Sequence, residues 1–277
     1  MKHEEGEFVG SGEIKLFFQN WKSRGETHAI VAIVHGVGEH SGRYQNLLEP
    51  MTAAHFTVYG FDQRGHGRSP GQRVFINDWS EYRDDLNAFV HFIQEQEPGK
   101  PIFLYCHNMG TVVGLDYLLH TPDGIKGAIL SGTPFESSGA VKPILISIAN
   151  VMSKVMPKFS INLGLDITAL SRDERVVRAY ANDLLVSRNA SARWGTEFLK
   201  STTWVREHVS ELTVPTFFIH GEADRLSVAQ AVSDKVKEIH LAEKTLIIYP
   251  GGYHEPHNDY GFPGVMGNVV DWLNQHT

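Results

Sequence analysis

Asn108, Asp224 and His254 follow one another in the chain order of a nucleophile, an acid and a base. The segment 106–110, with the sequence CHNMG, follows an apolar run and precedes a helical pattern. A strand, a sharp turn and a helix in this order present the nucleophile of the G-x-S-x-G pattern. Asn108 stands where that pattern has serine, and Cys106 replaces the first glycine. The segment therefore predicts a turn built for a nucleophile whose hydroxyl is missing.

Asparagine at this apex keeps the backbone role of the turn but loses the chemical one. It is among the few residues other than glycine that accept a positive φ at low cost. Its amide has no hydroxyl for a histidine to deprotonate, so we expect no acyl-enzyme to form at Asn108. Taken by itself, the segment is also compatible with an ordinary strand-to-helix turn.

The acid and the base are each expected just beyond a buried strand. Asp224 follows the apolar run 214–220, and His254 follows the run 245–249. A carboxylate at Asp224 would hold the imidazole of His254 in the tautomer that serves as general base. Taken singly, Asp224 is also typical of a turn or a helix cap, and His254 is one of fifteen histidines.

An oxyanion hole requires two backbone N–H groups that face the developing charge. We expect one from Met109, directly after the apex, and one from Val37, in the turn His35-Gly36-Val37-Gly38 that follows the first buried strand. Their side chains are incidental to this role. The alternative is that Gly36 and Gly38 are plain turn glycines.

A sheet is needed to bring these residues together. Short apolar runs predict strands, and apolar residues at helical spacing predict helices. After a hairpin at 7–19, the expected strands cover 29–34, 57–62, 102–105, 126–131, 214–220 and 245–249, and the expected helices cover 78–97, 109–120, 228–241 and 263–275. This alternation predicts an α/β fold with a mostly parallel central sheet flanked by helices on both faces.

Residues 135–206 interrupt the alternation with helical patterns and charged turns. We expect a helical cap here, inserted between a first core part at 1–134 and a second at 207–277. Its apolar residues are Ile144, Leu145, Ile146, Ile148, Val151, Met152, Val155 and Met156. They favour a lid whose inner face receives an acyl chain and whose outer face touches lipid aggregates. Packing of the same residues onto the core is the alternative.

Composition excludes several classes of function. The 277 residues include 25 Lys and Arg against 32 Asp and Glu, and a net charge of −7 argues against a nucleic-acid partner. A single cysteine excludes an internal disulfide and a cysteine-based zinc cluster. The sequence also lacks the H-E-x-x-H pattern of a zinc-binding helix, so we expect no metal site. The charged start MKHEEGEF lacks the apolar part of a signal peptide. We therefore expect a cytoplasmic protein that contacts membranes only peripherally.

Motifs spread over nearly the whole chain resemble those of the monoacylglycerol lipase and lysophospholipase branch of the α/β hydrolases. They are HGVGEHSGRY at 35–44, FDQRGHGRSPG at 61–71, the turn at 106–110, LSRDERVVRAY at 170–180, SARW at 191–194, HGEADRL at 220–226 and YHEPHND at 253–259. The resemblance implies the α/β-hydrolase fold. It also implies cleavage of a small acyl ester, a monoacylglycerol or a lysophospholipid, with no metal and no organic cofactor.

The resemblance also assigns roles to single residues. It implies a triad at Asn108, Asp224 and His254, and contacts to the polar head of the substrate from Glu39, Tyr180 and His257, with His107 beside the nucleophile position. The chain departs from the family pattern at Asn108, where serine is expected, and also at Cys106, Thr111 and Leu184. Only the change at Asn108 bears directly on activity.

Three hypotheses account for this combination. The first is an ester hydrolase whose nucleophile has been replaced, for example to trap a substrate. The second is a natural pseudoenzyme that binds lipid or a partner without turnover. The third is altered chemistry, in which Asn108 deamidates to aspartate and supplies a carboxylate nucleophile. A substitute nucleophile at Cys106 is disfavoured, because a side chain two residues before the apex should point into the core.

Overall fold

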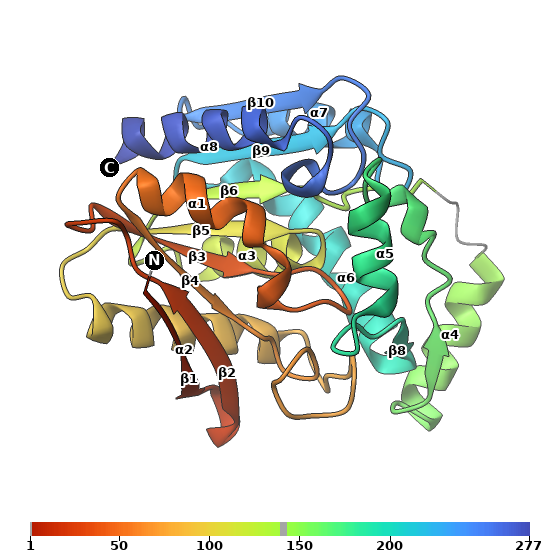
Figure 1. The fold of residues 1–277 in the computed structure, drawn as a ribbon. Helices are drawn as coiled ribbons and strands as arrows, with labels where there is room; N and C mark the ends of the chain where they lie inside the picture. The colour runs from red at the N-terminus through yellow and green to blue at the C-terminus, as the bar shows by residue number, and fades with distance from the viewer. Residues whose placement is uncertain (1, 139–142) are drawn as a thin grey trace.

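Eight strands form one sheet in the order β1-β2-β4-β3-β5-β6-β9-β10 (Figure 1). The computed structural model describes residues 2–138 and 143–277, and for residues 143–148 the backbone alone. The strands are β1 (His3–Val9), β2 (Lys15–Trp21), β3 (Ala29–Val34), β4 (Phe56–Phe61), β5 (Ile102–His107), β6 (Ile125–Ser131), β9 (Thr216–Gly221) and β10 (Lys244–Tyr249). From β4 to β10 every pairing is parallel, whereas β1 and β2 add antiparallel neighbours at one edge. The predicted α/β fold with a mostly parallel sheet is confirmed.

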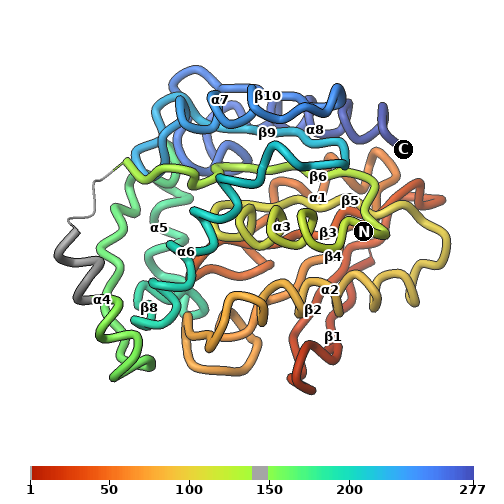
Figure 2. The backbone as a smooth tube through the Cα atoms, turned by 180° about the vertical axis from the view of Figure 1, so that it is seen from behind, coloured from red at the N-terminus to blue at the C-terminus, as the bar shows by residue number. Residues whose placement is uncertain are grey.

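Helices cover both faces of this sheet. One face packs against α1 (Gln45–Ala53) and α8 (Phe262–His276), and the other against α2 (Ser80–Gln96), α3 (Met109–His120), α6 (Ala192–His208) and α7 (Ala229–Glu238). Figure 2, from behind, shows α2, α3 and α6 in front of the strands. Strands β3, β4 and β5 are buried at every residue, as expected for strands between two helical layers.

Helix α1 is the core element that the apolar pattern did not reveal. It carries Pro50 inside and buries only Leu47, Leu48, Met51 and Thr52. A proline in a helix interior removes a hydrogen bond and usually marks a helix end, so nine residues with this pattern give a weak helical signal.

The segment between β6 and β9 contributes no strand to the main sheet among its described residues. It holds α4 (Pro143–Val155), the short pair β7 (Ser160–Asn162) and β8 (Asn189–Ser191), α5 (Glu174–Asn182), and α6, which returns to the core. We call residues 135–206 the cap segment. Figure 1 shows α4 and α5 beyond the carboxyl ends of the strands.

The apolar residues expected to form a lid fall into two groups. The side chains of Ile144, Leu145, Ile146 and Ile148 lie outside the described residues. At the described end of α4, Val151, Val155 and Met156 are 60%, 72% and 50% exposed, whereas Met152 is half-buried. Phe159 and Ile161, just beyond the helix, are exposed as well. An apolar surface therefore exists on the cap segment, and packing onto the core does not account for it.

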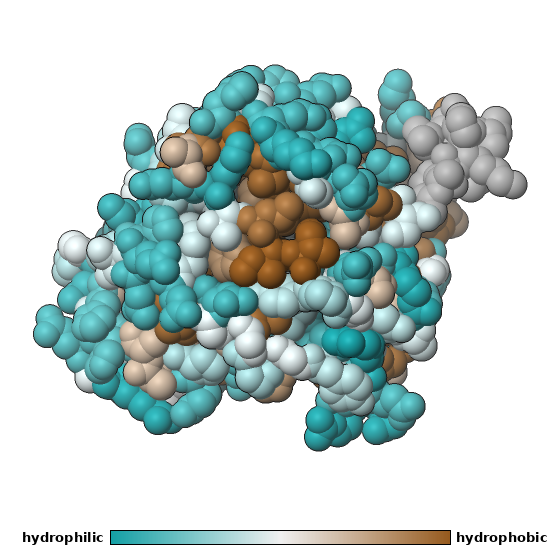
Figure 3. All heavy atoms as spheres, turned by 90° about the horizontal axis from the view of Figure 1, so that it is seen from above, coloured by the Kyte–Doolittle hydropathy of each residue, from teal (hydrophilic) through white to brown (hydrophobic). Residues whose placement is uncertain are grey.

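The other edge of the sheet is β10, whose six residues are all half-buried. It pairs only with β9. Figure 3, seen from above Figure 1, shows apolar side chains gathered on this side of the molecule. Among the described residues, no helix is both long and apolar enough to cross a membrane.

Candidate active site

Asn108 occupies the sharp turn between β5 and α3. Its φ of 50° is positive, as the sequence predicted for this apex. Two residues later, a Cβ added at Gly110 would lie 2.1 Å from the carbonyl oxygen of Val34, so only glycine lets α3 start this close to β3. The Thr111 hydroxyl donates to the Asn108 carbonyl at 2.7 Å and stabilises the turn. The side chain of residue 108 is thereby held at the carboxyl end of the sheet.

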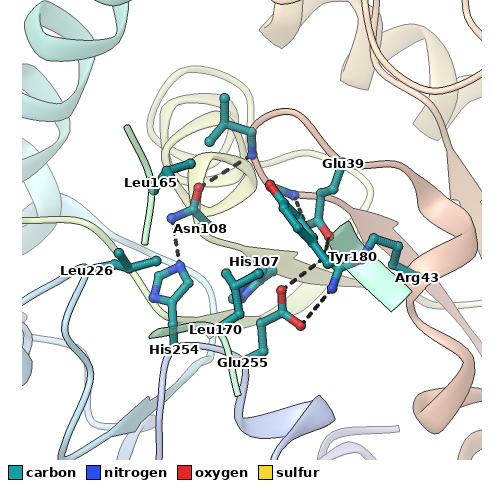
Figure 4. Close-up of a pocket in the computed structure, with 12 residues that line it drawn as sticks. Glu39, Arg43, His107, Asn108, Leu165, Leu170, Tyr180, Leu226, His254 and Glu255 are labelled. Atoms are coloured by element: carbon teal, nitrogen blue, oxygen red, sulfur yellow. Dashed lines mark hydrogen bonds and ion pairs between the residues drawn. The ribbon is translucent and has the colours of Figure 1, made fainter. Parts of the chain in front are cut away.

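The three predicted triad positions converge in space. His254 Nδ1 lies 2.7 Å from Asp224 Oδ2. On the other side of the ring, His254 Nε2 lies 2.8 Å from Asn108 Nδ2, the contact drawn in Figure 4. Because the amide nitrogen of Asn108 is a donor, Nε2 accepts, and the ring proton on Nδ1 donates to Asp224. This is the tautomer in which an imidazole acts as general base.

The charges of Asp224 and His254 shift the pKa of both side chains. Burial alone lowers the pKa of His254, but the charge of Asp224 and the hydrogen bond to it act in the opposite direction, and the net pKa is raised. Burial raises the pKa of the Asp224 carboxyl, yet His254 and His220 more than offset this, and its net pKa is well below the usual range. The carboxylate therefore stays ionised next to a histidine made more basic.

The loop after β3 brings the Val37 N–H, a predicted oxyanion donor, next to Asn108. The Val37 N–H points at Asn108 Oδ1, 3.4 Å away, while Met109 is the first residue of α3 beside the apex. The Gly36 N–H donates to Glu39 Oε1 at 2.6 Å, which fixes the preceding peptide. Gly38 has a φ of 71°, a conformation that favours glycine and also fits the alternative of a plain turn glycine.

The cap segment rests directly on this loop. The Ser187 N–H donates to the Gly38 carbonyl at 2.7 Å, and His40 Nε2 lies 2.8 Å from Asp183 Oδ2. On the other side of the site, the N–H groups of His254 and Glu255 donate to the carbonyls of residues 169 and 170 in the cap segment. Cap and catalytic loops are thus joined through backbone groups.

A buried charge cluster lies beside the triad. Arg43 forms ion pairs with Glu39 and with both oxygens of Glu255, the latter at 2.9 and 3.0 Å. The Tyr44 hydroxyl donates to Glu39 at 2.7 Å, and the ring of Tyr180, from α5, covers the guanidinium at 4.6 Å. Burial raises the pKa of Glu39, but Arg43, His107, His35 and the Tyr44 hydrogen bond together lower it by more, so this carboxyl stays ionised. The cluster joins the loop after β3, which carries Val37 and Glu39, to the loop that carries His254 and Glu255.

These groups line a small cavity of about 30 Å³. Its polar wall includes Glu39, Arg43, His107, Tyr180 and Glu255, and Leu165, Leu170 and Leu226 form its apolar wall (Figure 4). Asn108 and His254 lie where the two walls meet. The cavity thus presents the reacting position with a polar region on one side and an apolar region on the other.

His257, expected at the substrate head, does not line this cavity. It is fully buried behind His107, with ring centroids 4.8 Å apart, and it stacks on Tyr44. Burial lowers its pKa to about 4, so the ring is neutral at pH 7. The structure therefore puts His257 behind the cavity wall, against His107 and Tyr44.

Other site residues were not singled out from the sequence. Arg43 lies within the motif HGVGEHSGRY, and Glu255 lies within YHEPHND. The available signal for Glu255 was its position directly after His254, the predicted base. His220 lies against Asp224, and nothing in its sequence context announces that contact. Cys106 is buried in the core, and burial raises the pKa of its thiol, in line with its exclusion as a nucleophile.

Comparisons with known proteins identify the family and agree with the fold. Residues 25–261 match the family described as serine aminopeptidase, S33. A monoacylglycerol lipase of Mycolicibacterium smegmatis is 30% identical over 273 residues, covering 98% of this chain and 97% of that one. A monoglyceride lipase of Homo sapiens is 30% identical, covering 95% and 88%. The crystal structure of a monoacylglycerol lipase from Paleococcus ferrophilus superposes over the full length of both chains, with a TM-score of 0.85 and 27% identity.

Proposed function

Because this chain belongs to the monoacylglycerol lipase and lysophospholipase branch of the α/β hydrolases, a family of ester hydrolases, we propose that its cavity binds acyl esters and that Asn108 stops the reaction before acylation. In this proposal Asp224 orients His254, and His254 is the general base. Asn108 takes the position of the nucleophile. The N–H groups of Val37 and Met109 form the oxyanion hole, and residues 135–206 are the cap over the site.

One observation carries the proposal: the Asn108 side chain lies between the base and the oxyanion donor. Its Nδ2 is 2.8 Å from His254 Nε2, and its Oδ1 is 3.4 Å from the Val37 N–H. A hydroxyl at this position would meet a base already oriented by Asp224. The amide has no such proton to lose and also occupies the oxyanion donor, so the rest of the apparatus is assembled around a group that cannot attack.

The charges around the cavity favour a neutral polar head. Glu39 and Glu255 carry two negative charges against the one positive charge of Arg43. His107 adds no charge, because burial holds its pKa well below the ordinary value. A phosphate head would enter a region of net negative charge, whereas the hydroxyls of glycerol can exchange hydrogen bonds with carboxylates and with the Tyr180 phenol. We therefore propose monoacylglycerols, rather than lysophospholipids, as the substrate class.

The acyl chain is assigned to the apolar wall of Leu165, Leu170 and Leu226. Two of these leucines belong to the cap segment, so a chain lying along them leads toward its exposed apolar residues. We propose that this surface, with Val151, Val155 and Met156, contacts lipid aggregates from which the substrate is taken.

Asn108→Ser tests the proposal, with Asn108→Ala as the matched control. Both changes free the Val37 N–H, but only serine supplies a nucleophile. Loss of a triad serine costs on the order of 10⁶ in turnover, about 8 kcal/mol of barrier. The serine variant should hydrolyse monoacylglycerols and p-nitrophenyl esters and accept a fluorophosphonate label. The alanine variant and the present chain should do neither.

The remaining hypotheses correspond to other outcomes of the same experiment. A folded serine variant that hydrolyses no acyl ester and takes no label would contradict the proposal and favour a pseudoenzyme that binds lipid or a partner. Preference for lysophospholipids would overturn only the assignment of the head group. Conversion of Asn108 to aspartate would appear in the intact mass of the present chain as a gain of about one dalton, and the proposal expects none.

A further inference from the structure

The Asp224 carboxylate accepts more hydrogen bonds than the triad requires. Its Oδ1 receives the N–H groups of Leu226 and Ser227 at 2.7 and 3.1 Å. Its Oδ2 receives His254 Nδ1 at 2.7 Å and the Ser227 hydroxyl at 3.0 Å, and it lies 3.0 Å from Nε2 of His220. Both side chains of this last contact are fully buried. The oxygen that faces the catalytic histidine is thus shared with a second histidine.

The contact between His220 and Asp224 requires a proton. Asp224 is ionised, so an unprotonated Nε2 at 3.0 Å would place its lone pair against a lone pair of Asp224 Oδ2. Two buried acceptors at this distance repel each other. The other ring nitrogen, Nδ1, is buried and has no hydrogen-bond partner among the described residues. A proton there would lack an acceptor, so a neutral ring carries its hydrogen on Nε2. The acceptors around Nε2 are Asp224 Oδ2 at 3.0 Å, the Ser227 hydroxyl at 3.3 Å and the Ser227 carbonyl at 3.4 Å, and the ionised Asp224 oxygen is the nearest of them.

We infer that His220 is a positioning residue for the triad, which holds Asp224 Oδ2 and draws part of its negative charge away from His254. Its effect on geometry is small, because the two backbone N–H groups on Oδ1 and the Ser227 hydroxyl hold the carboxylate without it. What His220 governs is how much charge Oδ2 presents to the Nδ1 proton of His254. It therefore lowers the basicity that Asp224 confers on the catalytic base.

The titratable groups around His254 among the described residues are tied to other partners or, like His257, are neutral. The ring faces Asp224, the carboxylates of Glu255 and Glu39, and His107, whose ring centroid is 5.0 Å away. Glu255 and Glu39 are tied to Arg43, and a change at His220 leaves them in place. His220 itself is at the end of β9 and touches the triad only through Asp224 and Ser227.

The test compares His220→Leu with His220→Gln in the chain as it stands. Leucine removes the donor, whereas the side-chain amide of glutamine reaches about as far as Nε2 and keeps one. The readout is the pKa of His254, followed through its imidazole resonance by NMR and assigned with His254→Gln. Losing one hydrogen bond to the carboxylate should raise this pKa by about 0.5 to 1 in the leucine variant. The glutamine variant should titrate like the unchanged chain.

A purely structural role predicts a different result. If His220 served only to keep Asp224 in place, the leucine variant would loosen the Asp224–His254 contact and lower the pKa of His254. That result, or equal values in all three proteins, would overturn the inference. Should His220→Leu fail to fold, His220→Phe removes the same donor but keeps a ring in its place, and it should raise the pKa in the same way. The inference rests on the proposed role of His254 as the base, but the titration needs no substrate, so the two proposals fail separately.

Discussion

Gly38→Ala should destabilise the protein more than the same change at a glycine with nearly the same positive φ. A Cβ at Gly38 would lie 2.1 Å from the Ser187 carbonyl oxygen, whereas real Cβ contacts stay beyond 3.0 Å. The cap segment would have to retreat by about 0.9 Å, the difference between the two distances. That movement strains the 2.7 Å hydrogen bond from the Ser187 N–H to the Gly38 carbonyl.

The expected loss has two parts. A side chain at a φ near 70° costs about 1 to 2 kcal/mol, because its Cβ approaches the backbone in the left-handed region. Weakening one buried hydrogen bond adds about 1 kcal/mol, and the residual overlap adds more. Gly38→Ala should therefore lower the free energy of unfolding by about 2 to 4 kcal/mol.

Gly12→Ala isolates the first part. Gly12 has a φ of 70°, and nothing lies within 4 Å of its added Cβ. Urea unfolding of the two variants and the parent, followed by circular dichroism, gives the difference directly. If Gly38→Ala lowers the free energy of unfolding no more than Gly12→Ala, the contact between Gly38 and Ser187 of the cap segment does not form in solution.

Three further predictions concern the cap, the charge cluster and pH. Val155→Ser should weaken binding to phosphatidylcholine vesicles by roughly threefold or more, whereas Val9→Ser, equally apolar and exposed on the hairpin, should leave it unchanged; equal effects would refute the cap surface. Arg43→Met should cost about 3 to 5 kcal/mol in thermal or urea unfolding by stranding two buried carboxylates, and adding Glu255→Gln should recover part of that loss. In the serine variant, kcat/KM should fall on the acid side around a pKa above 6.5, because the raised pKa of His254 keeps the base protonated to higher pH; an inflection below 6.5 would contradict this.

The sequence was sufficient to predict the sheet and the three residues that lie together at its carboxyl edge. The apolar runs that predict strands end within one or two residues of the observed strands, since burial on both faces demands continuous apolar side chains. Asp224 and His254 were found because each follows such a run, and parallel strands bring their carboxyl ends to one edge. The positive φ of Asn108 was expected from the turn it occupies.

The contacts between side chains distant in the chain were not predictable. Arg43 reads as a surface charge in the sequence, yet its partner Glu255 is 212 positions away. Glu39 was assigned to the substrate, and the structure shows both of its oxygens also engaged by Gly36, Arg43 and Tyr44. These pairings depend on how two loops pack at the same edge of the sheet, and no periodicity encodes that.

The Arg43 cluster restricts the order in which sequences of this kind can diverge. If Glu255 is lost first, Arg43 still neutralises Glu39, and a buried neutral pair remains. If Arg43 is lost first, two buried carboxylates face each other with no cation between them, at a cost that is a large part of the stability of an ordinary domain. Among relatives, position 255 should therefore vary as long as position 43 is basic. Position 43 should lose its basic residue only in sequences that already lack the acidic residue at 39 or at 255.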